Sequence, residues 1–181
     1  MARLILLNGP PGVGKSTLAA RYVADHPLAL HLEIDAIRAS LGGWQDIEES
    51  KLVARRLARA MAEAHLRAGH DVVMPQYLGR TDFIADLDRL ASACDGELVE
   101  VLLWDSSEVV RERFQRRRAQ LRAEGGAHPE ADVDDASISS AISDAFARLE
   151  ALEVDRPRTR VISVAGSVDR AYEQLRQVTL R

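Results

Sequence analysis

Short apolar runs alternate with longer amphipathic stretches along the chain. The short runs have the length of strands and occupy residues 3–7, 28–34, 71–75, 98–104 and 160–164. Helical patterns separate them, at about 15–25, about 46–68, around 83–90, from 105 to the glycines at 125 and 126, at about 137–153 and at about 167–178. This alternation predicts βαβ units and a three-layer α/β fold with a five-stranded parallel sheet. Ligands of such folds bind beyond the carboxyl ends of the strands.

The helical pattern at 46–68 predicts which side of that helix is buried. Val53, Leu57 and Met61 recur every four residues, which places them on one helical face. We expect this face to pack on the core. Gly69 follows the pattern and is expected to end the helix as a C-cap residue.

The helix after the fourth strand is expected to begin at a capping residue. Asp105 and Glu108 have the three-residue spacing of a capping box, with Asp in place of the usual Ser or Thr. Val110, Phe114 and Leu121 are expected to face the core from this helix.

Length and composition limit the class of protein. A chain of 181 residues is long enough for one well-buried domain, so 1–181 is expected to be a single domain. Hydrophobic residues make up 46% and charged residues 29%, which excludes wholesale disorder. No apolar run approaches the roughly 20 residues that a membrane helix needs, and the start of the chain has no secretory pattern. The expected location is cytoplasmic.

Charge and cysteine content narrow the possible partners. The net charge is −4 and the pI is about 5.8, which argues against broad nucleic-acid binding. Lys15 and Lys51 are the only lysines, so the position of an arginine is more informative than the number of arginines. Cys94 is the only cysteine, which excludes an intrachain disulfide and predicts a packing role at a helix end.

A glycine-rich segment, GPPGVGKST at 9–17, lies between the first strand and the first helix. Its spacing is that of a Walker A motif, or P-loop, in which backbone N–H groups and the helix N-terminus surround a polyphosphate. The lysine is expected to contact the β- and γ-phosphates of ATP, and the Ser16 hydroxyl to coordinate Mg²⁺. The expected nucleotide-binding residues of this segment are Gly9, Pro11, Gly12, Val13, Gly14, Lys15, Ser16 and Thr17.

Asp35 and Arg38 follow the second strand and are three residues apart, on the same side of a helical turn. Transfer of a phosphoryl group to a hydroxyl needs a base near the γ-phosphate, and the end of a strand on the ligand edge is a suitable place for it. Arg38 would then bind an anionic or hydroxylated acceptor. The alternative is an N-cap aspartate followed by a solvated arginine.

The P-loop together with the Asp-x-x-Arg of EIDAIR makes the first forty residues resemble small P-loop kinases. These include the polynucleotide 5′-kinase and zeta-toxin group and the chloramphenicol phosphotransferases, and the order of the later elements is compatible with nucleoside-monophosphate-kinase-like folds. The resemblance implies that Lys15 and Ser16 bind ATP and Mg²⁺. It also implies that Asp35 is the base that activates the acceptor and that Arg38 contacts the acceptor.

The third strand departs from that family, in which many members end the strand with an aspartate. Here Pro75 stands at the end of the strand, so no carboxylate occupies the Walker B position. Gln76 is a candidate acceptor contact in its place, and Arg80 is another at the start of the next helix. Alternatively, Gln76 is an ordinary polar loop residue and Tyr77 is an aromatic residue that covers the core.

The helix after the fourth strand is rich in arginine. Phosphoryl transfer builds negative charge that arginines stabilise, and in the resembling kinases a lid after the fourth strand supplies them. We expect a lid at about 111–136, with Arg113 and Arg117 as catalytic residues and the other arginines on a solvated face. Gly166 follows the last strand, where a small residue lets the adenine approach the backbone.

The sequence therefore predicts an ATP- and Mg²⁺-dependent kinase that phosphorylates a hydroxyl of a small molecule, such as a sugar, a nucleoside-like metabolite or an antibiotic. Lys15, Asp35, Arg113 and Arg117 are the expected catalytic residues. A polynucleotide 5′-hydroxyl kinase and an ATPase or switch without an acceptor are the alternatives. Nucleic acid and membrane partners are not expected, and a monomer and a homodimer both remain open.

Overall fold

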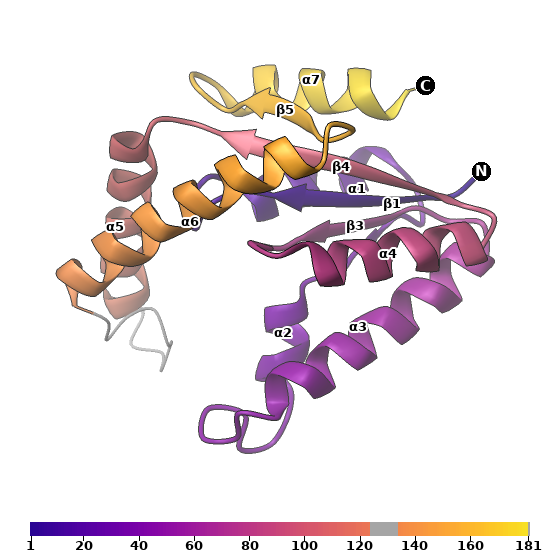
Figure 1. Cartoon of the computed structure of the whole chain (residues 1–181), viewed down its shortest axis with the longest axis horizontal. Coiled ribbons are helices and arrows are strands. Elements are labelled where there is room, and N and C mark those ends of the chain that lie inside the picture. The colour runs from indigo at the N-terminus through magenta and orange to yellow at the C-terminus, as the bar shows by residue number, and fades with distance from the viewer. Residues whose placement is uncertain (124–133, 181) are drawn as a thin grey trace.

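The strand that precedes the P-loop, β1 (Arg3–Asn8), is the central strand of a parallel sheet in the computed structural model, which describes residues 1–123 and 134–180 (Figure 1). The described sheet has five parallel strands, as the sequence predicted, and their order is β2-β3-β1-β4-β5. The other strands are β2 (Leu30–His31), β3 (Val72–Pro75), β4 (Glu97–Trp104) and β5 (Arg160–Ser163).

The central place of β1 explains its continuous apolar run. Residues 4–7 are at most 1% exposed, because helices cover both faces of the strand. Leu7 is in register with Pro75 of β3 on one side and with Val101 of β4 on the other. The residues after β3 and β4 therefore flank the P-loop.

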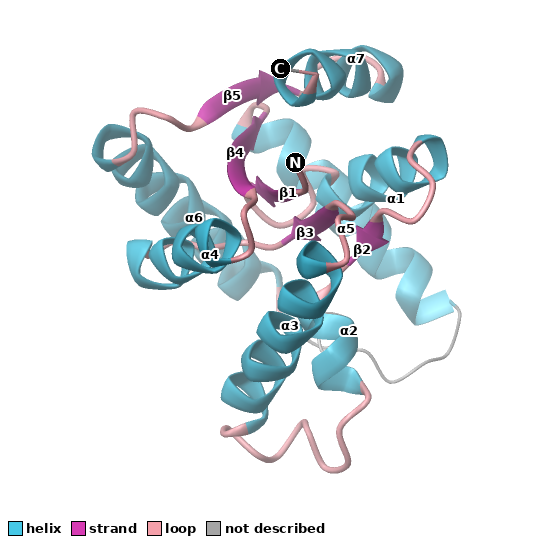
Figure 2. Ribbon diagram, turned by 90° about the vertical axis from the view of Figure 1, so that its right-hand side faces the viewer, coloured by secondary structure: helices cyan, strands magenta, loops and turns pink. Residues whose placement is uncertain are grey.

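Helices form a layer on each face of the sheet, and Figure 2 shows them when turned from the view of Figure 1. One layer contains α1 (Lys15–Asp25), α5 (Ser107–Ala123) and α7 (Val168–Thr179), and the other contains α3 (Ser50–Arg67) and α4 (Thr81–Ala93). The helix α6 (Asp135–Asp155) contributes Ile138 and Ile142 to the first core and Leu149 and Leu152 to the second. None of the described helices is long and apolar enough to span a membrane.

The second strand is much shorter than predicted. Leu30 and His31 pair with β3 as strand residues, and the Leu32 N–H adds one more hydrogen bond to it. A further helix, α2 (Ile34–Ala39), begins where the strand was expected to continue. Leu28 has a φ of 65°, and the Ala29 N–H donates to the His26 carbonyl, so a turn occupies the expected start of the strand. The prediction failed because an apolar run does not by itself distinguish a strand from a turn followed by a helix.

The predicted buried face of α3 is wrong. Leu57 and Met61 are 43% and 44% exposed, whereas Ala54, Ala58 and Ala62 are fully buried. Alanine side chains are small, so this face packs closely on α2 and on β1 and β3. The helix also begins at Ser50 rather than at residue 46.

The capping residue of α5 is Ser106 and not Asp105. The Ser106 hydroxyl accepts a hydrogen bond from the Val109 N–H at 3.3 Å, and the helix begins at Ser107. Val110 and Phe114 are buried as predicted. The side chain of Leu121, and residues 124–133 of the expected lid, lie outside the described part of the chain.

Candidate active site

The P-loop packs against the start of α5 while its last glycine faces open space. Gly12 has a φ of 83°, and a Cβ there would lie 3.1 Å from the Val110 carbonyl oxygen. Gly14 has a φ of 105° and is the N-cap residue of α1, and a Cβ there would meet nothing within 4 Å. A phosphate cradle needs this combination of a supported loop and an unobstructed helix N-terminus, so these residues fit a polyphosphate.

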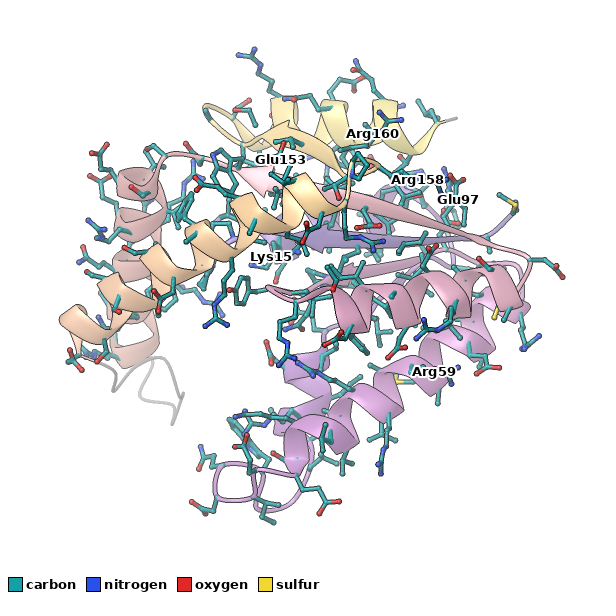
Figure 3. All side chains as sticks on the ribbon, viewed as in Figure 1. Lys15, Arg59, Glu97, Glu153, Arg158 and Arg160 are labelled. Carbon is teal, nitrogen blue, oxygen red and sulfur yellow. The ribbon has the colours of Figure 1, made fainter. Side chains whose placement is uncertain are left out.

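Lys15 folds back onto the loop that precedes it. Its Nζ donates to the carbonyl oxygens of Gly9 and Pro10, both at 3.0 Å. Figure 3 shows Lys15 near the carboxyl end of β1. Ser16 and Thr17 are exposed in the first turn of α1. The cation and the two hydroxyls therefore lie at the loop and at the start of α1.

A cavity of about 230 Å³ adjoins the P-loop. It brings together Gly166, from the turn between β5 and α7, and Arg113 of α5. Because the sequence separates these residues by fifty or more positions, the fold creates this neighbourhood. The described lining is Gly12, Val13, Gly14, Thr17, Leu18, Arg113, Val164, Gly166, Val168 and Ala171.

Arg113 forms an ion pair with Asp105, at 3.1 Å between Nη1 and Oδ2. Asp105 is only 6% exposed, so it follows β4 as a buried partner of the arginine. Arg117 is exposed one turn further along α5. Arg118 is only 3% exposed, so the expectation that the remaining arginines form a solvated face is wrong for this residue.

The acceptor candidates Asp35 and Arg38 both lie on α2. Glu33 is the N-cap residue, so Asp35 is not the cap and its carboxylate is exposed in the first turn. The Arg38 guanidinium donates to the Ser50 hydroxyl at 2.9 Å and to the Trp44 carbonyl at 3.2 Å, and it stacks on the Trp44 ring. The loop before α3 thus holds Arg38, which is not a freely solvated arginine.

The loop after β3 lacks a carboxylate, as the sequence indicated. The Gln76 N–H donates to the Leu7 carbonyl at 3.1 Å, which keeps Gln76 beside the end of β1. Arg80 is 82% exposed and pairs with Asp82 at 3.3 Å, so a contact with an acceptor would require it to leave this partner. Among the described residues, no three His, Cys, Asp or Glu side chains are grouped to hold a metal ion.

Two structural features at this edge of the sheet were not predicted from the sequence, namely the hydrogen bonds of Asn8 and the packing of α6. Asn8 bonds the P-loop to the loop after β3 through its side-chain amide, and it is 3% exposed. The second is α6, because a Cβ on Gly79 would lie 3.2 Å from Cδ of Arg148. Burial beside α6 raises the pKa of Tyr77. The only sequence feature that pointed to either of them is the single asparagine before the first glycine of the P-loop.

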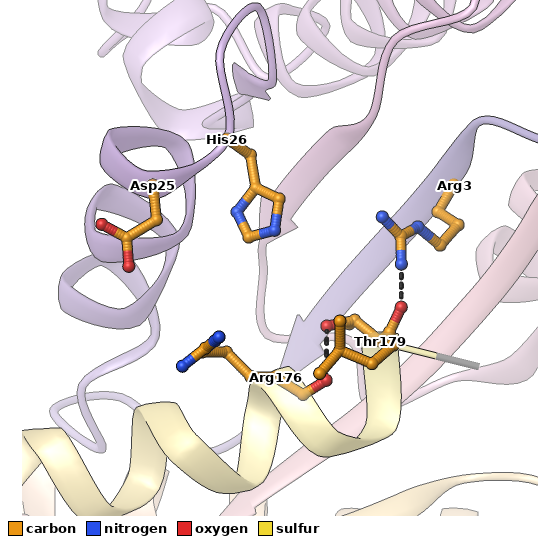
Figure 4. A pocket seen from close by; sticks show the side chains of 6 residues that line it. Arg3, Asp25, His26, Arg176 and Thr179 are labelled. Atoms are coloured by element: carbon orange, nitrogen blue, oxygen red, sulfur yellow. Dashed lines mark hydrogen bonds between the residues drawn. The ribbon is translucent and has the colours of Figure 1, made fainter.

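A larger cavity, of about 330 Å³, lies at the opposite end of β1 (Figure 4). Arg3 donates there to the Thr179 carbonyl, and Arg176 and His26 complete much of the rim. This cavity adjoins the amino end of the strand, whereas the P-loop follows the carboxyl end. It is therefore separate from the candidate active site.

The central β1, the P-loop with its lysine and the adjoining arginine helix define a P-loop kinase, a nucleotide-binding phosphotransferase. A family model described as an AAA domain matches residues 4–140, and the chain belongs to this family. An adenylate kinase from Synechococcus sp. (strain RCC307) is 31% identical in an alignment of 134 residues that covers 66% of this chain and 71% of that protein.

Solved structures share the fold at lower identity. A gluconokinase from Sinorhizobium meliloti 1021 superposes with a TM-score of 0.62 and 20% identity, covering 97% of this chain and 91% of that chain. A chain of the Pnkp1/Rnl/Hen1 RNA repair complex superposes with a TM-score of 0.68 and 18% identity, covering 85% of this chain and 46% of that chain. The resemblance to small P-loop kinases that the sequence indicated is confirmed.

Proposed function

We propose that this kinase transfers the γ-phosphate of ATP to a hydroxyl group of a small molecule, in a Mg²⁺-dependent reaction. The observation that carries the proposal is the arrangement at the carboxyl edge of the sheet. The P-loop and its cavity lie beyond the centre of the sheet, and α2 presents an exposed aspartate after the edge strand β2. A donor site and a potential base at one edge are what a hydroxyl kinase needs.

The donor side of the proposal uses the P-loop and Arg113. Lys15 would exchange the carbonyls of Gly9 and Pro10 for phosphate oxygens, and the N–H groups at the start of α1 would bind the remaining oxygens. Arg113 would exchange Asp105 for the developing negative charge of the transferred group, with Arg117 assisting. The base of ATP would occupy the cavity beside Gly166.

The exposed Ser16 hydroxyl is the candidate magnesium ligand, since the strand beside β1 ends in Pro75. Bound Mg²⁺ would neutralise charge on the phosphates. Without a Walker B carboxylate, Ser16 and water would complete much of its coordination shell.

On the acceptor side, Asp35 would accept the proton of the attacking hydroxyl. Arg38, held by Ser50 and Trp44, would orient the acceptor, and Gln76 and Arg80 would add contacts from the loop after β3. The main alternative acceptor is the 5′-end of a polynucleotide. The net charge of −4 favours a small molecule over a polynucleotide 5′-end, although the fold also matches a chain of an RNA repair complex.

The experiment is an acceptor panel with ATP and Mg²⁺, read by mass gain of the acceptor. The panel contains D-gluconate and other sugars and sugar acids, nucleosides, adenosine monophosphate, antibiotics with free hydroxyls and a 5′-hydroxyl RNA oligonucleotide. Phosphorylation of a hydroxyl group of a small molecule supports the proposal, whereas conversion of adenosine monophosphate alone to its diphosphate, a transfer to a phosphate, would contradict it. Phosphorylation of only the oligonucleotide, or ATP hydrolysis at ordinary enzyme rates with no phosphorylated acceptor, would contradict it.

Asp35→Asn tests the assigned base on the acceptor that the panel identifies. We expect kcat to fall by about 10²-fold or more, because a positioned base contributes a factor of that order. The KM for ATP should change little, since Asp35 lies on α2 and not in the P-loop. Asp86→Asn, at an exposed position on α4, is the matched control and should retain wild-type turnover. Unchanged turnover in Asp35→Asn would remove Asp35 from the mechanism.

A further inference from the structure

Asn8 is the only asparagine in the chain, and it is buried at the junction of β1 and the P-loop. Its side-chain amide makes three hydrogen bonds. The Oδ1 atom accepts from the Gly9 N–H at 2.8 Å and from the Leu78 N–H at 2.9 Å, and Nδ2 donates to the Leu78 carbonyl at 2.8 Å. Both polar atoms of the amide are therefore satisfied in a buried position, where an unpaired group would be costly.

The side-chain amide of Asn8 bonds to both backbone groups of Leu78, as the backbone of a neighbouring strand would. Backbone pairing between β1 and β3 reaches Leu7 and Pro75, and the Gln76 N–H still donates to the Leu7 carbonyl. Beyond this point the Asn8 side chain supplies the donor and the acceptor that bind Leu78. Gln76 and Leu78 are thus both fixed to the end of β1, and the loop after β3 is attached to the P-loop.

A continuous set of hydrogen bonds runs from the P-loop lysine to this loop. Lys15 donates to the Gly9 carbonyl, the Gly9 N–H donates to Asn8, and the same Asn8 oxygen accepts from Leu78. A bound nucleotide would draw Lys15 toward its phosphates, so it would change the interactions of Gly9, which shares an acceptor with Leu78. A physically connected network of this kind can carry coupling between two sites when a ligand alters it.

We propose that Asn8 is a positioning residue that couples nucleotide binding at the P-loop to the order of the loop 76–80. Phosphate oxygens that accept from the N–H groups of the P-loop would hold the loop, and with it Gly9, more firmly. The shared Oδ1 atom of Asn8 would then fix Leu78 more firmly as well. The loop carries Gln76 and Arg80, the proposed acceptor contacts, so the inference rests on the proposed function. Binding of the phosphate donor would order the loop that contacts the acceptor.

The test is amide hydrogen exchange of the full chain with and without MgADP. In the wild-type protein we expect MgADP to slow exchange of the Leu78 amide about 5-fold or more, the lower end of typical coupling between sites. The Leu32 amide, which donates to Val73 on the β2 side of β3, is the internal comparator and should change less. An unchanged Leu78 amide with saturating MgADP would overturn the inference, and this arm needs no variant.

Asn8→Ala separates coupling from simple structural support. It should lower the protection of Leu78 in both states, but the decisive quantity is the additional protection that MgADP gives. This increment should be lost while MgADP still protects the amides at the start of α1. Retention of the increment would overturn the inference.

Thr179→Val is the matched control, because Thr179 is also buried and its hydroxyl donates to the Leu175 carbonyl, far from the P-loop. This variant should lose stability but keep the MgADP increment at Leu78, and loss of the increment there would also overturn the inference. Since no acceptor is present in these measurements, their outcome is independent of the acceptor panel and of the role of Asp35.

Discussion

The cations of the candidate site are all held by protein groups. Two P-loop carbonyls bind Lys15, Asp105 binds Arg113, and Ser50 with the Trp44 carbonyl binds Arg38. These contacts keep long side chains ordered before a substrate arrives, which reduces the conformational entropy lost on binding. Each substrate must then offer better acceptors than the ones it displaces.

Substitution of two P-loop glycines by alanine should have different effects on stability. Gly12→Ala and Gly14→Ala both place a side chain at positive φ, which costs about 1–3 kcal/mol. Gly12→Ala should cost about 1–3 kcal/mol more, because its Cβ also presses on Val110 and Phe114 of α5. Urea unfolding of both variants measures the difference. Equal free energies of unfolding would show that the contact with α5 is not tight.

Chemistry at the level of single residues was partly predictable. The roles expected of Lys15 and Ser16 follow from local spacing in one segment, and the structure gives that segment the expected form. The contacts of Asn8 with Leu78, seventy positions away, and of Asp105 with Arg113 depend on how strands pair and helices pack. No local pattern in the sequence encodes such long-range partners.

At the scale of elements, α3 shows why hydrophobicity alone misassigns a helix face. The buried stripe consists of alanines at 54, 58 and 62 with Leu66, and larger apolar side chains such as Leu57 remain half exposed. Close packing of this face on its neighbours favours alanine, which is small, over larger apolar side chains. A periodicity argument weighs Leu and Met more heavily than Ala and therefore selects the adjacent face.

Substitutions on the two faces of α3 test this assignment. Ala58→Leu should destabilise the protein by about 1–3 kcal/mol, because Ala58 is fully buried and the larger side chain would push the helix from the sheet. Leu57→Ala, which removes a half-exposed side chain, should cost less than about 1 kcal/mol. Thermal unfolding of both variants provides the comparison, and a larger loss for Leu57→Ala would restore the face predicted from the sequence.

The order and class of the elements were predictable, while several ends were not. All five strands and the parallel α/β arrangement follow from the alternation of short apolar runs and amphipathic stretches. The ends of β2 and the start of α5 were misplaced because turns near Leu28 and capping by Ser106 involve single backbone and side-chain contacts. Such contacts are decided locally by geometry and not by apolar periodicity.

At the scale of the whole molecule, the two ends of the sheet serve different purposes. The carboxyl end carries the P-loop and the other loops of the proposed active site, and a polar network joins the elements at the amino end. There the Arg3 guanidinium and the Tyr22 hydroxyl both donate to Asp71 at 2.7 Å, and Arg3 also bonds to the end of α7. This network joins the first strand, the first helix, the start of β3 and the last helix.

The network predicts a pH dependence of global stability. Burial raises the pKa of Asp71, but the hydrogen bonds from Arg3 and Tyr22 outweigh it, so the pKa in the folded protein lies below its ordinary value. The unfolded carboxyl group titrates near about 3.9. The stabilisation is therefore complete well above that pH and is lost as the pH falls through the lower folded pKa.

Asp71→Asn measures this contribution. At pH 7 the variant should be less stable than the wild type by about 2 kcal/mol, the size of a hydrogen bond to a charged group. The difference should shrink as the pH falls below about 4, because the wild-type carboxylate becomes protonated. Urea unfolding between pH 3 and 7 checks both statements, with exposed Asp86→Asn as control. A difference that does not change with pH would mean that the Asp71 charge does not stabilise the fold.

The contact of Lys15 with its own loop affects which anions can bind to the P-loop. The loop carries an internal competitor, two carbonyl oxygens that already occupy the ammonium group at 3.0 Å. A single inorganic anion would bring few oxygens and recover little beyond what it displaces, whereas a di- or triphosphate would engage the lysine and the helix N-terminus together. These contacts of Lys15 would therefore favour chelating polyphosphates over the abundant free phosphate of a cell.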